Sequence, residues 1–356
     1  MKPTVLKRPK LRKDYITILY VLSSLAVVYF HCSNRFYVFE PTGDWVRSCI
    51  IEALTWFAVP VFYMITGATL MDYRDRYDTK TYFKKRLQKA LIPFLLWSLL
   101  WFIKNDIYDV YRATGTISID LSVSLGRFLT GGFTPTFWFF IPLFAIYLCI
   151  PVLSLIPKPS RQNVFKYIIL LGLIFNSFLP LIFDMLNIKY NFNFTLASNF
   201  LIYPIIGYYL ANYKLKKKER LSIYILGAFS LLYLIIFTII SSFQKGETVD
   251  ILWNREYILV ALFSSSVFLG IKDLFRHKKH SKVKQHTIKI CNFLAPATFG
   301  VFVLHFFIMG IIKEPLHVDD ASVFWQLLAP PLIFIICIAI TKIIQKIPIL
   351  KHLLPE

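Results

Sequence analysis

The chain is poor in charged residues: Asp, Glu, Lys and Arg make up 17% of its 356 residues, against about 25% in soluble domains. Its five cysteines are too few for a small fold held together by disulfides. Its 13 glycines exclude a collagen-like repeat. Acidic residues are also scarce, since 20 Asp and Glu face 40 Lys and Arg, which leaves a net charge of +20. With 56% hydrophobic residues, the chain is not a disordered polymer either.

The hydrophobic residues are grouped in blocks of about 20, which as helices are long enough to cross a hydrocarbon core of about 30 Å. We predict ten transmembrane helices, at residues 15–32, 46–71, 90–111, 136–156, 164–184, 196–213, 221–242, 252–272, 292–312 and 322–345. The expected fold class is therefore an all-α polytopic membrane protein. It forms one domain over 1–356, in which a basic N-terminus (1–14) and a C-terminal tail (346–356) flank a ten-helix bundle over 15–345.

The basic residues are distributed unevenly between the predicted connections. Most of the 40 Lys and Arg lie in the two termini and in every second loop, beginning with the loop 72–89. Because cytoplasmic loops retain Lys and Arg during insertion, both termini are expected to face the cytoplasm. The basic excess is then a feature of topology and not of a nucleic-acid partner, and attraction to anionic membrane lipid is a secondary role.

Polar residues at membrane depth are costly, and one helix carries four of them on one side. Thr17, Tyr20, Ser24 and His31 are spaced by 3, 4 and 7 residues, which places them on one face of a helix. Such a stripe either joins this helix to its neighbours through hydrogen bonds or lines a site. His31 lies at the outer end of the helix, where an interfacial histidine can also be solvated at low cost.

Two further ionisable residues lie at a similar depth on other helices. Glu52 is in the second helix with no basic residue nearby in that helix, and His305 is in the outer half of the ninth. If the first two helices form an antiparallel pair, Glu52 is at the level of His31, and a carboxylate beside an imidazole fixes its tautomer. The alternative is a carboxylate that reaches water through the outer loops. Together the three residues predict a site that opens to the outside.

Five apolar motifs in order resemble a known family. They are LSSLAVVYFH (22–31), FAVPVFYMITG (57–67), YFKKRLQKALIP (82–93), the run from FWFF (137–140) to Pro151, and FGVFVLH (299–305). Over about 15–310 the chain is similar to the membrane acyltransferase-3 family. Its nearest subgroup is the bacterial O-acetyltransferases of surface polysaccharides and their lipid-linked precursors.

This resemblance implies transfer of an acyl group, commonly acetyl from acetyl-CoA, to a sugar hydroxyl in a bacterial cell membrane. His31 would be the base and Glu52 its orienting partner. Trp138 would form a wall of the site, and with it the candidate substrate-binding residues are Tyr20 and His305; the candidates for the phosphates of acyl-CoA are Lys85, Arg86 and Lys89. The basic residues could instead anchor the topology, and Trp138 could be an interfacial aromatic residue. The partners would be acyl-CoA, a glycan or lipid-linked saccharide, and membrane lipid; no metal is expected and the oligomeric state stays open.

The chain departs from the family pattern at four positions. Tyr20 and Trp56 stand where the family often has Arg, Thr136 where it has His, and Thr17 where it has an acidic residue. Lost cations would weaken stabilisation of developing negative charge. Basic residues on outer segments that could substitute are Arg47, Lys104, Arg112 and Arg127. The departures leave a second hypothesis open, a non-catalytic relative that assists polysaccharide export or assembly. A small-solute transporter is less favoured, because no paired broken helices in related halves are evident.

Overall fold

The computed structural model describes residues 14–117, 119–275, 281–348 and 350–355, and this part of the chain folds into helices without strands. The helices are α1 Asp14–Cys32, α2 Gly43–Thr55, α3 Ala58–Leu70, α4 Thr79–Arg86, α5 Ile92–Phe102, α6 Val110–Thr114, α7 Leu121–Thr130, α8 Phe140–Leu153, α9 Lys158–Gly172, α10 Leu179–Met185, α11 Ile202–Asn212, α12 Lys217–Lys245, α13 Ile258–Leu274, α14 Lys282–Leu294, α15 Thr298–Leu316 and α16 Ala329–Lys346. The N-terminal basic residues on which the predicted orientation partly depends lie outside the described residues.

Seven helical stretches in the described residues are long and apolar enough to cross a membrane. They are Asp14–Cys32, Gly43–Asp75, Thr79–Thr114, Lys158–Met185, Lys217–Lys245, Lys282–Leu316 and Phe324–Lys346. The other three predicted spans contain the shorter helices α8, α11 and α13. All ten predicted segments are therefore helical, while the number of ten crossings and the side on which the termini lie stay predictions.

The third predicted span begins earlier than the hydropathy pattern indicated. A continuous helix runs from Thr79 to Thr114 and joins α4, α5 and α6 through π-helical turns at Leu87–Leu91 and Ile103–Asp109. Asp78 caps its N-terminus by accepting a hydrogen bond from the Thr81 amide at 2.8 Å, and bonds from the Thr81 side chain and amide lower the pKa of Asp78. The predicted acyl-CoA residues thus lie on a helix or its π-turn, and not in a loop.

Two predicted spans are interrupted. The segment 46–71 is divided into α2 and α3 at Trp56–Phe57, where Pro60 lacks the amide that would bond to the Trp56 carbonyl. The segment 292–312 is divided into α14 and α15 by a 3-10 turn, Ala295–Ala297, which contains Pro296. Irregular backbone at membrane depth is tolerated where it is enclosed by protein or lines a cavity.

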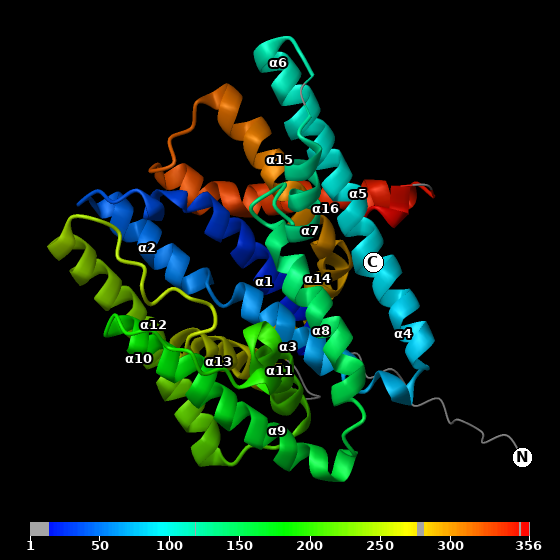
Figure 1. Ribbon diagram of the computed structural model, residues 1–356, viewed down its shortest axis with the longest axis vertical. Helices are drawn as coiled ribbons and strands as arrows, with labels where there is room; N and C mark the ends of the chain where they lie inside the picture. Colours follow the sequence, from blue (N-terminus) through cyan, green and yellow to red (C-terminus); the bar gives the residue numbers. More distant parts are fainter. Residues whose placement is uncertain (1–13, 118, 276–280, 349, 356) are drawn as a thin grey trace, which may run out of the picture.

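Helix α1 lies in the middle of the bundle (Figure 1) and packs against α2, α3, α13, α14, α15 and α16. Its Leu19 and Val28 are fully buried. Helix α12, in contrast, exposes a row of large apolar side chains that includes Phe229, Leu232 and Ile236, as expected of a face that contacts lipid. The polar stripe of α1 is therefore enclosed by other helices.

Helices α3 and α11 cross at unusually short distance because each contributes a glycine to the contact. A Cβ atom added to Gly67 would lie 1.8 Å from the Pro204 carbonyl oxygen. One added to Gly207 would lie 2.1 Å from the Met64 carbonyl oxygen. Small residues at such crossings let helix backbones approach closely in membrane proteins.

Replacing Gly207 by Ala should therefore destabilise the bundle, by about 1–3 kcal/mol, the usual cost of overpacking. Thermal unfolding of the purified protein in detergent measures the effect. Gly126→Ala is the matched control, because a Cβ there meets nothing within 4 Å, and it should leave the unfolding temperature unchanged or raise it slightly. An equal response of the two variants would refute the close crossing.

Candidate active site

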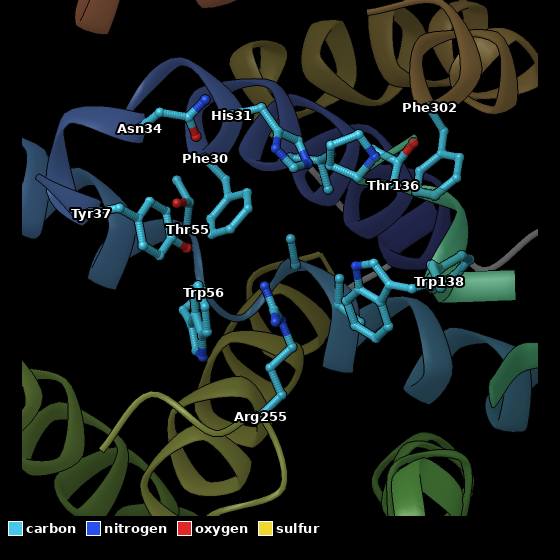
Figure 2. Close-up of a pocket in the computed structure, with 15 residues that line it drawn as sticks. Phe30, His31, Asn34, Tyr37, Thr55, Trp56, Thr136, Trp138, Arg255 and Phe302 are labelled. Carbon is cyan, nitrogen blue, oxygen red and sulfur yellow. The ribbon is translucent and has the colours of Figure 1, made fainter. Parts of the chain in front are cut away.

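A cavity of about 320 Å³ opens beside the C-terminal end of α1 (Figure 2). It is called the His31 cavity below. It is lined by Val27, Phe30, His31, Asn34, Tyr37, Thr55, Trp56, Ala58, Val59, Pro135, Thr136, Trp138, Phe139, Arg255 and Phe302. Trp56 lies at the break between α2 and α3 and forms part of this wall. The interruption of the predicted span is therefore next to the cavity. Its aromatic walls with a few polar groups are typical of small-molecule sites.

His31 and His305 come together from α1 and α15. Their ring centroids are 5.2 Å apart with a tilt of 31°. The Nδ1 atom of His305 lies 2.8 Å from the Val301 carbonyl oxygen, which assigns the proton to Nδ1 and leaves Nε2 as an acceptor. That Nε2 is buried and has no hydrogen-bond partner among the described residues. In the same part of the chain, no group of three His, Cys, Asp or Glu side chains could hold a metal ion.

Glu52 does not form the hydrogen bond to His31 that the sequence suggested. It is fully buried in α2, and within the described residues both of its carboxylate oxygens lack a hydrogen-bond partner. Arg255 is the charged residue that acts on it electrostatically. The residue that meets the His31 ring is instead His305.

Arg255 is the cation of the His31 cavity, and sequence reasoning did not single it out. Its guanidinium carbon lies 3.8 Å from the ring centroid of Trp56 and 5.0 Å from that of Trp138. The Tyr203 hydroxyl donates to the Arg255 carbonyl oxygen and fixes this segment, which precedes α13. Arg255 thus places a positive charge next to Trp56. Trp56 itself stands at a position where the family often has Arg. The sequence feature that could have identified Arg255 is an arginine close to aromatic residues at the start of an apolar helix.

The basic residues that the sequence suggested as substitutes for the missing cations lie outside the His31 cavity. Arg47 bonds to Gln326 at 2.7 Å, Lys104 pairs with Asp109 at 2.7 Å, and Arg127 pairs with Asp106 at 2.5 Å. Arg112 is exposed on α6. None of the four lines the His31 cavity.

A second cavity, of about 670 Å³, lies beside the N-terminal half of α1 and is called the Arg86 cavity. Its lining includes Thr17, Tyr20, Arg86, Lys89, Tyr147, Pro296 and Pro355. The second helix break and the C-terminal tail thus contribute to its wall. The Nε atom of Arg86 is buried without a hydrogen-bond partner among the described residues, so this guanidinium has donor capacity to spare.

The predicted site residues are therefore divided between two places. His31 and Trp138 line the His31 cavity, and His305 packs against the His31 ring. Tyr20 lines the Arg86 cavity with two of the predicted acyl-CoA residues. The third, Lys85, lies outside this lining, with its ammonium group 3.8 Å from the centroid of the Tyr77 ring.

The two cavities share a wall made by Phe139 and Phe302, whose ring centroids are 5.1 Å apart. The polar stripe of α1 passes both cavities, from Thr17 and Tyr20 in one to His31 in the other. Between them, the Ser24 hydroxyl is buried and has no partner in the described part of the chain. Tyr20 and His31 are about 16 Å apart along the helix axis at 1.5 Å per residue.

The long apolar helices fit a multi-pass membrane protein, and the two cavities lie along its central helix α1. A family model described as an acyltransferase domain, that of acyltransferase family 3, matches residues 13–344. The chain belongs to this family, which supports an acyltransferase function. Comparisons with curated proteins and with solved structures gave no match.

The two cavities should be reachable from opposite sides of the membrane. In a chain whose five cysteines are replaced, His31→Cys should react with a membrane-impermeant thiol reagent added outside intact cells. Tyr20→Cys should react only when the cytoplasmic side is exposed in inverted vesicles. Leu232→Cys, on the apolar exposed face of α12, is the control that should stay unlabelled. Labelling of both cavity cysteines from one side only would contradict the arrangement.

Proposed function

We propose that the protein is a membrane O-acyltransferase, which moves an acyl group, acetyl in the simplest case, from acyl-CoA to a hydroxyl of a surface polysaccharide or its lipid-linked precursor. The observation that carries the proposal is the pair of cavities along α1. One is lined by two basic residues, the other is lined by His31, whose ring packs against that of His305, and a single aromatic wall separates them. The uneven distribution of Lys and Arg supports a cell-membrane protein with the Arg86 cavity on the cytoplasmic side.

The Arg86 cavity suits the acyl donor. Arg86 and Lys89 line it and can bind phosphate oxygens of acyl-CoA through charge-assisted hydrogen bonds. Its remaining wall is largely apolar and aromatic, with Phe139, Phe140 and Phe299 among its members, which suits the uncharged arm that carries the thioester. The phosphates stay near the basic rim while the arm extends along α1.

The His31 cavity suits the acceptor. His31 removes the proton of the acceptor hydroxyl as its oxygen attacks the thioester carbonyl carbon. The tetrahedral intermediate then expels the thiolate, so that the C–S bond breaks, the ester remains on the acceptor, and the proton passes to the released CoA thiol. His305 is placed beside His31 with an unprotonated Nε2, which can accept a hydrogen bond from the His31 ring when that ring carries the proton.

The shared wall limits how donor and acceptor meet. For the acyl carbonyl to reach His31, the rings of Phe139 and Phe302 have to separate. Phe302 is only partly buried, and rotamer changes of such side chains are fast compared with turnover. A closed wall keeps water from the thioester until the acceptor is bound, because hydrolysis of a reactive donor is suppressed in closed sites.

Replacing His31 by Ala should lower acceptor-dependent turnover of acetyl-CoA by about 10²-fold or more, because the general base is lost. The assay follows release of the CoA thiol by the purified protein in the presence of glycan acceptor. His286→Ala is the control, since His286 is exposed on α14 and lines neither cavity. A wild-type protein that releases no CoA thiol, together with loss of surface polymer on gene deletion, would favour the non-catalytic role.

Replacing Arg86 by Gln should raise the KM for acetyl-CoA about tenfold with little change in kcat, because phosphate binding is the same in the ground and transition states. Lys84→Gln removes an exposed positive charge from the same helix without touching the cavity, and it should leave both constants unchanged. If the two substitutions had equal effects, general surface charge and not the Arg86 cavity would bind the donor.

A further inference from the structure

Arg255 is held in an unusual way in the His31 cavity. Its guanidinium is stacked against Trp56, with its carbon 3.8 Å from the ring centroid, and also faces Trp138 at 5.0 Å and Phe30 at 5.4 Å. Aromatic faces stabilise the cation above and below its plane. They leave the N–H groups, which lie in that plane, without acceptors.

Within the described residues, Arg255 makes no ion pair within 4 Å, and its buried Nε has no hydrogen-bond partner. Glu52 and Tyr37 affect the Arg255 guanidinium only electrostatically, as nearby groups. An enclosed guanidinium with free in-plane donors is preorganised for an oxyanion with two oxygens, such as a carboxylate or a phosphate.

Arg255 lies across the cavity from His31, as Figure 2 shows. A group that stabilised the thioester oxyanion would have to be about 3 Å from that oxygen, close to the base. A residue on the opposite wall contacts a different part of the same ligand. The position of Arg255 therefore favours recognition of the acceptor over stabilisation of the reacting carbonyl.

We propose that Arg255, held between Trp56 and Trp138, binds a carboxylate or phosphate group of the acceptor, so that the protein acts on an anionic saccharide and His31 receives a hydroxyl of it. The inference rests on the proposed function for the identification of the ligand as an acceptor. The binding site itself requires no turnover and can be tested without acetyl-CoA.

Binding of three probes to the purified full-length protein tests the proposal by calorimetry. Methyl glucuronide carries a carboxylate, glucose 1-phosphate carries a phosphate, and methyl glucoside is neutral. The wild-type protein should bind at least one charged probe about tenfold or more tightly than the neutral one. The charged probe that binds more tightly identifies the anion. Equal affinity for all three probes would overturn the proposal, and this comparison needs no variant.

Variants then assign the preference to Arg255. Arg255→Gln should remove the preference for the charged probe and leave affinity for the glucoside unchanged, while Arg255→Lys should restore part of it. Arg127→Gln is the matched control, because Arg127 is also expected on an outer segment but pairs with Asp106 and does not line the cavity. If Arg255→Gln weakened the binding of charged and neutral probes equally, Arg255 would have only a structural role. Lack of acetyl-CoA consumption would refute the proposed function, whereas the measured preference for a charged probe would still support the anion site at Arg255.

Discussion

The structure depends on one constraint: a polar side chain at membrane depth has to be enclosed by protein, because hydrocarbon offers it no hydrogen bonds. Helix α1 carries four such side chains on one face, and six helices surround it. Both helix breaks, at Trp56–Phe57 and Ala295–Ala297, occur where the backbone lines a cavity. The interruptions, the polar stripe and the cavities are therefore parts of the same arrangement.

The two cavities connect this arrangement of helices with the proposed transfer reaction. A water-soluble acyl donor and a membrane-bound or external acceptor cannot meet in the lipid, so a transferase that joins them needs an internal path. In the function proposed above, this path follows α1, and Phe139 and Phe302 divide it. Cations lie at both ends, Arg86 in one cavity and Arg255 in the other, so each cavity can bind a charged ligand on its own side of the wall.

Periodicity and hydropathy predicted the helical segments but not their interruptions. The pattern over 46–71 predicts one continuous helix, and only the structure shows that it is divided into α2 and α3 shortly before Pro60. Glu52 was misjudged for a related reason. From one sequence its depth matched that of His31, but in the structure Arg255 is the charged group that acts on it, and His305 is the residue that meets the His31 ring. Arg255 itself was one of several basic residues on expected outer segments, and a sequence does not show which of them points inward.

The sequence by itself determined that the chain is helical, membrane-embedded and a member of its family, because block length, composition and motif order are local properties. It also determined which face of α1 is polar, since that depends only on the helical repeat. Tertiary structure alone decided that His31 meets His305, that Arg255 lies between two indole rings, and that there are two cavities. These depend on helix crossings and breaks, which bring together residues as distant in sequence as His31 and His305, 274 positions apart.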